Sequence, residues 1–524
     1  MLPLLLGALL VQTPGPAASP RTVPEATDHT ETSRLADVER FCRAATKLPH
    51  GDRITLRTAG RSAGGKDLLL VHVALPPDPA RPRLRALVIG DIHGGEVEGK
   101  EALQLLVREF AAGEHEARGQ QVELGLLPVY NPDGNDASAV GNRQGQNGPD
   151  ACGERQNGGG LDLNRDFVKA DAPETRALLG LWNTIDPHLF VDLHTTNGSA
   201  HGYHLTYAPS LSPNVDPGIA KVSRDLLDDA QAAMRDDHGF QTFDYGNFET
   251  RDWDGGGAPE SAQGARGWSP YDSRARYGTN GFALRNRIAI LSEAYSYCDF
   301  ATRIAATRAF VLCLLQGLVD HRAACEQAVA AADRLLVQPD AAVAFGFATQ
   351  FAEPEQLDVL AAELEQVAAH DGRPMRYVRK GDGTAERMPV VRAFRATQQL
   401  PLPDAWAIPA PPPDVLDRLT LHGIRFETLA AARTAPVERF AVHQKRKPKR
   451  PYQGHQELVL DGAWQPAEPR ELPAGTVLVP ARQPLARLAA TLLEPQSDDS
   501  LSTWNFFEQQ TGEFHPVLRV GEAR

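Results

Sequence analysis

From Leu84 to Glu96 the chain reads LRALVIGDIHGGE, a short apolar run that stops at a glycine before a polar loop. A run of this length, bounded by a glycine, is typical of a strand that is buried on both faces of its sheet. Apolar residues at helical spacing follow over Val97–Phe110. The stretch therefore predicts a strand, a loop and a helix, which is the repeating unit of an α/β fold.

The same alternation of short apolar runs and helical patterns extends in both directions along the chain. Strands are expected at Leu68–Leu75, Val122–Tyr130, His188–Leu193 and Ile288–Glu293, and helices at 34–48, 174–183 and Thr302–Leu336. Two irregular, glycine-rich segments, 135–160 and 243–281, interrupt this rhythm. Long irregular segments inside a compact domain are usually functional loops. The pattern predicts an α/β domain, with a sheet buried on both faces, that carries two such loops.

The two ends of the chain differ from this α/β part. An apolar run followed by small residues predicts a signal peptide over residues 1–19, cut near Ala17–Ser19. Such a peptide implies export to a periplasmic or extracellular space. The polar residues 20–33 are expected to form a disordered linker. Residues 34–338 are then the α/β domain, and 339–524, which have more proline and shorter apolar runs, an accessory domain of mixed or mostly β structure.

Composition excludes several classes of function. A chain of 524 residues suits two or three domains. Its formal net charge of −13 argues against a general nucleic-acid binder, whose binding surface would be basic. After the N-terminal run, no stretch reaches the ~18 consecutive apolar residues of a transmembrane helix, so none is expected. The 5 cysteines form no CxxC pair, which argues against a cysteine zinc site.

Potential metal ligands follow two of the expected strands. His93 and Glu96 lie three residues apart in the loop after Ile89, and the two glycines between them let both side chains face one point. His194 stands at the end of a second strand, and ligands of open α/β sheets bind at that edge. Two imidazoles and a carboxylate, with a position left open for water, make a catalytic zinc site.

Other polar residues in the sequence suit a hydrolytic site. In Asp162-Leu163-Asn164-Arg165, the Arg165 guanidinium can grip a carboxylate through two parallel hydrogen bonds, and Asn164 can add another. Glu293 ends an apolar strand, where an acid is either paired or functional because burial of an isolated charge is costly. A carboxylate there is suited to act as the general base on a water molecule activated by a metal.

The ordered set of motifs resembles the zinc metallocarboxypeptidases of the carboxypeptidase A class. It consists of HxxE at 93–96, Asn-Pro-Asp-Gly at 131–134, Asp-Leu-Asn-Arg at 162–165, Asp-Leu-His at 192–194 and the strand-terminal Glu293. The resemblance covers roughly residues 34–335. It implies a mixed, mostly parallel twisted sheet flanked by helices. The run Leu284-Arg285-Asn286-Arg287 resembles a bacterial-type subgroup of this family.

The resemblance also implies a role for each residue of the set. These roles are binding of one zinc ion by His93, Glu96 and His194, orientation of the first zinc histidine by Asp162, capture of the substrate's terminal carboxylate by Asn164 and Arg165, and general base and acid catalysis by Glu293. The arginine that stabilises the transition state is either Arg155 or Arg143. We favour Arg155, which lies nine residues before Asn164.

The chain also departs from the family pattern. The mobile tyrosine of the pancreatic-type enzymes has no counterpart by motif, although Tyr271 and Tyr277 are the nearest candidates. Arg285 or Arg287 either binds a carboxylate of the substrate or forms a salt bridge that orders its loop. Aromatic residues of the segment 243–281 either line an apolar specificity pocket or pack the loop down; they are Phe243, Tyr245, Phe248, Trp253 and Trp268.

The predicted function is zinc-dependent hydrolysis of a peptide bond next to a free C-terminus, with a peptide as the partner. One alternative is a zinc amidase or deacylase that acts on cell-wall peptides or N-acyl amino acids, since the same ligand arrangement serves those reactions. Another is an inactive binding module, against which the complete ligand set and Glu293 argue. Cleavage of C-terminally free and amidated peptides distinguishes the first two readings.

Overall fold

The computed structural model describes residues 19–75, 82–196, 198–248, 267–338, 343–370 and 372–521. Two predictions concern residues outside these ranges. Nearly all of the predicted signal peptide, 1–18, and the aromatic residue Trp253 lie outside the described residues.

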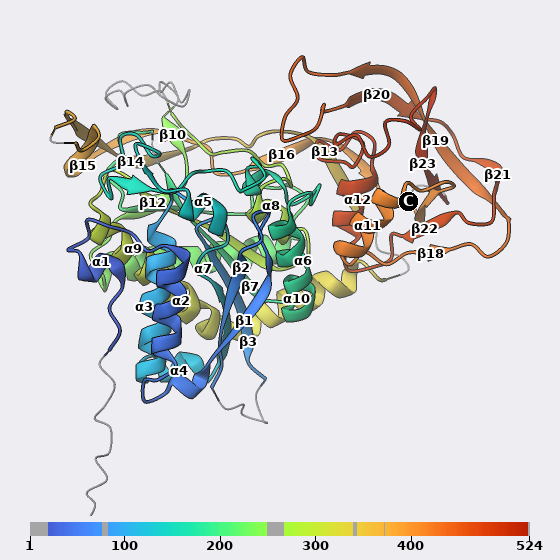
Figure 1. The fold of residues 1–524 in the computed structure, drawn as a ribbon. Helices are drawn as coiled ribbons and strands as arrows, with labels where there is room; N and C mark the ends of the chain where they lie inside the picture. The colour runs from blue at the N-terminus through green and yellow to red at the C-terminus, as the bar shows by residue number, and fades with distance from the viewer. Residues whose placement is uncertain are drawn as a thin grey trace, which may run out of the picture.

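Within the described residues, an eight-stranded mixed sheet forms the centre of the N-terminal two thirds of the chain (Figure 1). In spatial order its strands are β1 (Ile54–Arg61), β2 (Asp67–Val73), β4 (Val122–Leu127), β3 (Leu84–Gly90), β7 (Leu189–Thr196), β12 (Ile288–Tyr295), β8 (Leu205–Pro209) and β9 (Thr242–Asp244). The four central strands, β4, β3, β7 and β12, run parallel to one another. The predicted α/β fold with a mixed sheet is confirmed.

Helices cover both faces of this sheet, as the apolar runs of its strands require. One face packs against α2 (Leu35–Ala45), α3 (Glu98–Ala112), α7 (Pro217–Asp236) and α9 (Phe300–Asp320). The other packs against α6 (Pro173–Ile185) and α8 (Gly278–Ala283), where Trp182 stacks on Phe282 at 4.1 Å between ring centroids. Shorter elements complete this part: α4 (Glu116–Gly119), α5 (Pro132–Asp136), β5 (Ala139–Val140), β6 (Ala151–Cys152), and the 3₁₀ turns η1 (Gly51–Arg53) and η2 (Leu163–Arg165).

The helix predicted over Thr302–Leu336 is two helices. The first, α9, ends at Asp320, and α10 (Arg322–Leu335) begins after His321, whose backbone is not helical. By length and composition α9 is apolar enough to cross a membrane, but most of its residues are buried against α3, α7 and the sheet. Its apolarity is therefore that of a core helix.

Residues 20–33, predicted to be a disordered linker, are ordered against α3. A short helix, α1 (Val23–Ala26), begins at a capping box in which Thr22 and Glu25 satisfy each other's backbone N–H groups. Arg108 donates two hydrogen bonds of 2.7 Å to Glu25, and Ser33 donates two to the buried Glu101. The prediction of disorder was wrong because the polar side chains of this segment have partners that are distant in the sequence.

The C-terminal region is rich in β structure, as predicted, and is divided among three sheets. A two-stranded ribbon pairs β13 (Ala344–Phe351) with β16 (Phe394–Pro401). The long hairpin β14 (Glu355–Val367) and β15 (Arg376–Val390) joins β10 (Asn247–Phe248) and β11 (Trp268–Ser269) of the α/β part in one sheet. The third sheet consists of β17 (Ala405–Ile408), β18 (Glu427–Thr428), β19 (Arg433–Arg446), β20 (Val459–Trp464), β21 (Glu468–Leu472), β22 (Val477–Pro480) and β23 (Phe514–Val520), with helices α11 (Pro413–Leu421) and α12 (Ala486–Leu493).

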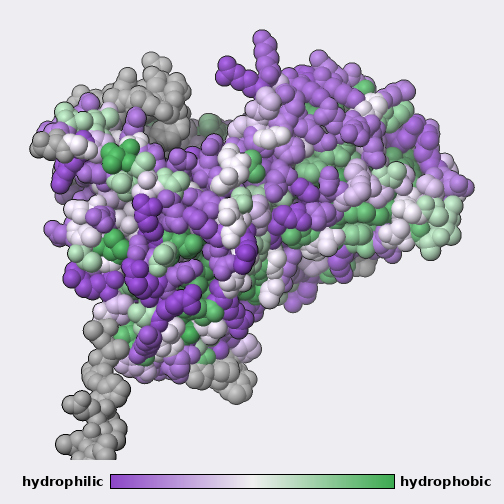
Figure 2. Space-filling view, viewed as in Figure 1, coloured by the Kyte–Doolittle hydropathy of each residue, from purple (hydrophilic) through white to green (hydrophobic). Residues whose placement is uncertain are grey.

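This last sheet and its helices lie beside α6 and α8 (Figure 1) and share a core with the α/β part. The shared cluster joins Ala275 and Leu284 to Trp406 and Trp504 of the C-terminal region. On the molecular face drawn in Figure 2, hydrophilic residues predominate, and apolar residues are scattered between them. The C-terminal region is thus packed onto the α/β part through both a β hairpin and an apolar core.

A buried ion pair crosses the boundary between the two parts. Arg276 Nε donates to Asp499 Oδ1 at 2.7 Å, and the two side chains are 2% and 1% exposed. Arg276 also lies over the ring of Trp504, at 4.5 Å from the centroid. Arg276 Nη2 lies 2.8 Å from a second carboxylate, Glu457 Oε1, so the buried guanidinium is stabilised by two acids of the C-terminal region.

We expect Asp499→Ala to lower the free energy of unfolding by about 2–3 kcal/mol, because it removes the buried acceptor of Arg276 Nε and leaves the guanidinium with Glu457, at 2.8 Å, as its carboxylate partner. Urea unfolding followed by circular dichroism measures the change. Asp358→Ala is the control, since Asp358 pairs with Arg387 at 3.5 Å and both side chains are 61% exposed. Equal unfolding midpoints for the two variants would show that the buried pair does not stabilise the fold.

Candidate active site and metal centre

The predicted site residues meet at the carboxyl ends of three adjacent strands. His93 and Glu96 lie in the loop between β3 and α3, and His194 lies on β7. Glu293 on the neighbouring strand β12 is directly opposite His194 in the parallel register. The sheet topology therefore brings together four residues that span two hundred positions of sequence, and it does so at the edge where α/β sheets bind ligands.

Close packing against the Asn131–Gly134 turn shapes the loop that carries His93 and Glu96. A Cβ atom at Gly94 would lie 2.3 Å from the backbone carbon of Gly134, so only glycine fits there. Asn131 Nδ2 donates to the carbonyl of Ile92 at 3.2 Å, which holds the loop against this turn. The Asn-Pro-Asp-Gly motif thus acts as a support for the ligand loop.

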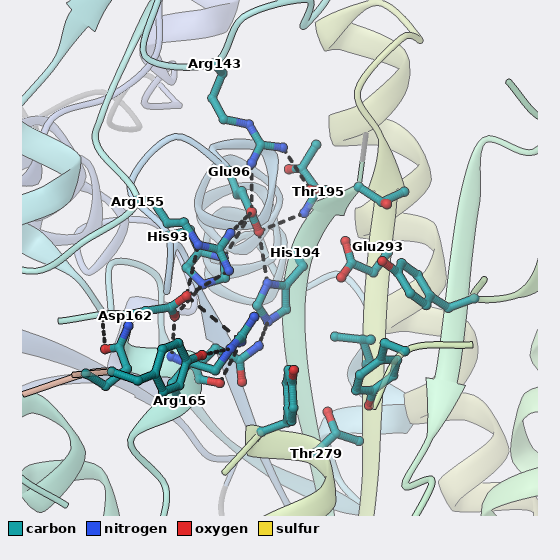
Figure 3. A pocket seen from close by; sticks show the side chains of 18 residues that line it. His93, Glu96, Arg143, Arg155, Asp162, Arg165, His194, Thr195, Thr279 and Glu293 are labelled. Atoms are coloured by element: carbon teal, nitrogen blue, oxygen red, sulfur yellow. Dashed lines mark hydrogen bonds and ion pairs between the residues drawn. The ribbon is translucent and has the colours of Figure 1, made fainter. Parts of the chain in front are cut away.

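The side chains of His93, Glu96 and His194 form a compact buried cluster (Figure 3). One ligand atom from each lies within 4.8 Å of the others. His93 Nδ1 is 3.0 Å from Glu96 Oε1, and His194 Nδ1 is 2.9 Å from Glu96 Oε2. His93 Nδ1 is buried and has no hydrogen-bond partner among the described residues. A buried imidazole lone pair that faces a carboxylate and a second imidazole fits a zinc ion.

The other nitrogen of each imidazole faces an aspartate. His93 Nε2 lies 3.0 Å from Asp162 Oδ1, and His194 Nε2 lies 3.0 Å from Asp192 Oδ2. Burial opposes ionisation of Asp162, but His93 and the Arg155 guanidinium hold its pKa well below the ordinary value. An ionised Asp162 accepts a hydrogen bond from the Nε2–H group of His93, so the unprotonated Nδ1 of His93 faces the metal site.

Sequence analysis did not assign Asp192, although a signal was present. Residues two apart on a strand point to the same face. Asp192 precedes His194 by two positions on β7, and both side chains are buried. The Asp-Leu-His motif therefore contains both a candidate ligand and the carboxylate that orients it.

Two arginines approach Glu96 along different paths (Figure 3). Arg143 donates to Glu96 Oε1 at 2.9 Å and to the carbonyl of Thr195 at 2.9 Å, and its side chain is 14% exposed. Arg155 donates to Asp162 Oδ2 at 2.9 Å and lies 3.5 Å from Glu96 Oε1, and its side chain is 45% exposed. Arg143 thus holds Glu96 and the Thr195 carbonyl, and Arg155 is the more exposed of the two arginines that line the cavity.

Asn164 and Arg165 lie in the same cavity, in the turn η2 that follows Asp162. The backbone N–H of Asn164 donates to Asp162 Oδ1 at 2.9 Å, and Asn164 Oδ1 accepts the N–H of Gly278 at 2.9 Å. The Arg165 guanidinium lies over the ring of Tyr277, 4.3 Å from its centroid. These contacts fix both side chains beside the ligand cluster.

Glu293 has no hydrogen bond to His93, Glu96 or His194 and lies across the cavity from His93 (Figure 3). Burial is the main cause that raises the pKa of its carboxyl, to about 8. His194 and Arg143 lower this pKa, and the neighbouring carboxylates Glu96 and Asp192 raise it. This pKa of Glu293 is that of the site without a metal ion. A divalent cation nearby would favour the ionised carboxylate and so lower the pKa.

The cavity has a volume of about 460 Å³. Beyond the residues already described, its lining consists of Thr195, Thr196, Tyr245, Tyr271, Tyr277, Thr279, Leu291, Tyr452 and Gln453. The hydroxyl of Tyr271 is buried without a hydrogen-bond partner among the described residues. Both tyrosine candidates of the sequence therefore lie at the site, and Tyr245 joins them.

Other aromatic residues of the predicted loop pack away from the cavity. Phe248 and Trp268 form a cluster with Val359 and Val390 of the β14–β15 hairpin. Phe243 stacks on Tyr203, with 5.0 Å between ring centroids. Of the aromatic residues named from the sequence, the four that are described therefore divide: Tyr245 lines the cavity, which also has charged residues in its lining, and the other three pack against neighbouring side chains.

The two arginines before β12 do not line the cavity. Arg285 donates to the carbonyl and to Nδ1 of His422, and Arg287 pairs with Asp186 and Asp333 at 2.7 and 3.0 Å. Of the two readings offered by the sequence, the structure supports contacts that order the loop.

Sequence analysis missed two residues that lie at the site, Tyr452 and Gln453. They come from the C-terminal region, nearly three hundred residues after Asp162, and no motif marks them. The 5 cysteines, all of which are described, are buried and form no disulfide with one another.

Comparison with known proteins relates the chain to carboxypeptidases. A family model described as zinc carboxypeptidase matches residues 39–278, a range that includes His93, Glu96 and His194 and ends before Glu293. Carboxypeptidase 2 of Trichophyton tonsurans is 24% identical over 457 residues, which cover 84% of this chain and 77% of that protein. The human carboxypeptidase N catalytic chain is 34% identical over 118 residues, covering 21% of this chain and 24% of its own.

Solved structures give a more distant likeness. A metallo-carboxypeptidase from Burkholderia cenocepacia has a TM-score of 0.42 and 17% sequence identity, and the match covers 56% of this chain and 71% of that one. The predicted bacterial-type subgroup stays a prediction, since these comparisons do not test it.

Proposed function

The chain belongs to the zinc carboxypeptidase family through residues 39–278, and from that premise we propose how its own residues cut a peptide. The chain is a zinc-dependent hydrolase that removes residues from the C-termini of peptides. We assign the reaction to residues 34–338, with 339–524 as the accessory domain. The observation that supports the residue assignments is a single cavity that holds the ligand cluster, the Asn164–Arg165 pair and Glu293.

His93, Glu96 and His194 would hold one zinc ion in this cavity. A zinc ion in such a site polarises the scissile carbonyl and makes water more acidic. Asp162 and Asp192 would keep each imidazole in the orientation that the cluster shows, through the Nε2 contacts of 3.0 Å. Arg143 balances the negative charge of Glu96 from the other side.

Substrate would be placed by its terminal carboxylate. Arg165 offers a planar guanidinium that matches a carboxylate through paired hydrogen bonds, and Asn164 adds an amide donor. Both donors lie beside the metal cluster, so they would hold the last peptide bond near it. A peptide without a free carboxylate lacks this anchor, which accounts for cleavage at the chain end.

Glu293 would act as the base and then as the acid. Its carboxylate takes a proton from the attacking water as the oxygen–carbon bond forms, and it passes that proton to the nitrogen as the carbon–nitrogen bond breaks. Arg155 would stabilise the negative charge that develops on the carbonyl oxygen, a contribution of about 3–4 kcal/mol per donor in other enzymes. The greater exposure of Arg155 supports this choice over Arg143.

We expect a peptide with a free C-terminus to be cleaved at least about 100-fold faster than its C-terminal amide, because a site built to bind a charged group discriminates strongly against its absence. Arg165→Ala should remove most of this preference by raising KM for the free peptide. Rates are measured by chromatography on the matched pair of peptides. Arg235→Ala, on the exposed end of α7, is the control. Equal cleavage of both peptides by the unaltered protein would contradict the carboxylate anchor.

We also propose that the protein is exported. The apolar run near the N-terminus, followed by small residues, supports a signal peptide over residues 1–19. Mass spectrometry of the protein recovered outside the producing cells should give a mature N-terminus near Ala17–Ser19. Recovery of the uncut chain inside the cells would contradict export.

A further inference from the structure

A tight turn of the C-terminal region reaches the active-site cavity. This turn, residues 452–455, contributes Tyr452 and Gln453 to the cavity lining, beside Arg165 and Asp162. It belongs to the irregular segment between β19 and β20. The site is therefore built from both parts of the chain, and the accessory region supplies side chains to it.

The first contact of the turn is with the proposed carboxylate anchor. Arg165 Nε donates a hydrogen bond of 3.1 Å to the hydroxyl oxygen of Tyr452. On its other edge, Arg165 Nη1 donates to the carbonyl of Asn164 at 2.9 Å, and the ring of Tyr277 lies against its face. The guanidinium is thus held at two edges and one face, with Tyr452 as the holder that comes from the C-terminal region.

The second contact reaches the residue that orients His93. The backbone N–H of Asp162 donates to Gln453 Oε1 at 2.9 Å. Asp162 also contacts His93 and Arg155 through its side chain. The turn therefore contacts two residues of the site. One is Asp162, which contacts His93, and the other is Arg165, which we propose binds the carboxylate of the substrate.

The turn itself is rigidly placed. Reciprocal backbone hydrogen bonds of 2.7 and 3.0 Å join Tyr452 and His455, and the residues between them, Gln453 and Gly454, have positive φ angles of 49° and 79°. The His455 Nε2 atom lies 2.7 Å from Asp171 Oδ2 of the α/β part. Tyr452 and His455 both pack on the buried ring of Trp504.

We propose that the 452–455 turn is a wall of the substrate site and that Tyr452 is a positioning residue, which holds Arg165 in the orientation that receives the substrate's terminal carboxylate. Fixing the guanidinium before binding lowers the conformational entropy that is lost when the carboxylate is bound. The inference rests on the proposed function, because it assumes that Arg165 binds that carboxylate. It gives the C-terminal region a role in substrate binding.

The test removes only the hydroxyl group. Tyr452→Phe keeps the ring on Trp504 and deletes the acceptor of the Arg165 hydrogen bond. We expect KM for a peptide with a free C-terminus to rise about 5- to 10-fold with kcat within about twofold, because an interaction made equally in ground and transition states is lost. Zinc content and the thermal unfolding midpoint should stay unchanged, which a merely structural role of the hydroxyl would not allow. Tyr377→Phe, in β15, is the matched control.

A double-mutant cycle separates the two proposals. In an Arg165→Ala background, Tyr452→Phe should change KM less than twofold, because the hydroxyl acts through the guanidinium. An unchanged KM in Tyr452→Phe, or the same loss with and without Arg165, would overturn the positioning role and leave the carboxypeptidase assignment intact. If Arg165→Ala itself leaves KM and the preference for free peptides unchanged, the proposed anchor fails and the role of Tyr452 fails with it.

Discussion

Glu293→Gln should lower kcat by about 1,000-fold or more while the protein keeps one zinc ion per chain. General base catalysis contributes factors of about 10²–10⁴, and the same group here also returns the proton to the leaving nitrogen. The substitution keeps the size of the side chain and removes its capacity to take a proton. Since Glu293 is not among the ligand cluster, the metal should stay bound.

The pH profile gives this prediction a second readout. A protonated carboxyl cannot accept a proton, so kcat/KM of the unaltered protein should fall as the pH drops through the pKa of Glu293. Burial raises that pKa in the metal-free site, and a bound cation lowers it again. The pH at which kcat/KM falls on the acidic side therefore depends on both effects. In Glu293→Gln the residual rate should lack this limb.

The measurements are peptide hydrolysis and zinc content by atomic absorption. Glu174→Gln is the matched control, because burial also raises the pKa of the Glu174 carboxyl, which lies away from the cavity and accepts the backbone N–H of Ala63 at 2.9 Å. Normal turnover in Glu293→Gln with zinc bound would assign the base to another residue.

Removal of the metal should abolish peptide hydrolysis without unfolding the chain. The ligand cluster is held together by its own charges, since Glu96 contacts both imidazoles and the Arg143 guanidinium at 2.9–3.0 Å. Dialysis against a chelator should therefore leave the far-ultraviolet circular dichroism spectrum unchanged. Addition of zinc should restore the activity.

Stability should nevertheless fall, because a metal that binds only the native state stabilises it by about 3 kcal/mol at a free concentration 100 times its Kd. His194→Ala should reproduce the loss of both zinc and activity, and His238→Ala, at the exposed end after α7, should change neither. Scanning calorimetry with and without zinc measures the shift. Full activity after exhaustive chelation, with zinc shown to be absent, would contradict a metal-dependent reaction.

Much of this site was predictable because its chemistry lies at the ends of buried strands. The apolar runs before His93, His194 and Glu293 place those residues at one edge of a parallel sheet, and the order of motifs indicates their roles. Asp192 was within reach of the same reasoning through the two-residue repeat of a strand. The helix α7, whose start is capped by Asp216, was not predicted from the sequence.

The remaining residues depend on contacts that local sequence patterns do not encode. Tyr452 and Gln453 meet Arg165 and Asp162 only because the C-terminal region packs on the α/β part through a shared core. Residues 20–33 were read as disordered for the same reason, since Glu25 finds its partner Arg108 on α3. Polar residues with distant partners resemble linker residues until the fold is known.

The position of Tyr452 in the chain has a consequence for protein synthesis. A ribosome adds His93, Glu96, His194 and Glu293 first, and at about 5–20 residues per second it reaches Tyr452 about 10–30 s after Glu293. During that interval Arg165 and Asp162 lack the partners that the turn provides. The proposed carboxylate anchor is thus completed only after the C-terminal region has been synthesised, later than the rest of the site.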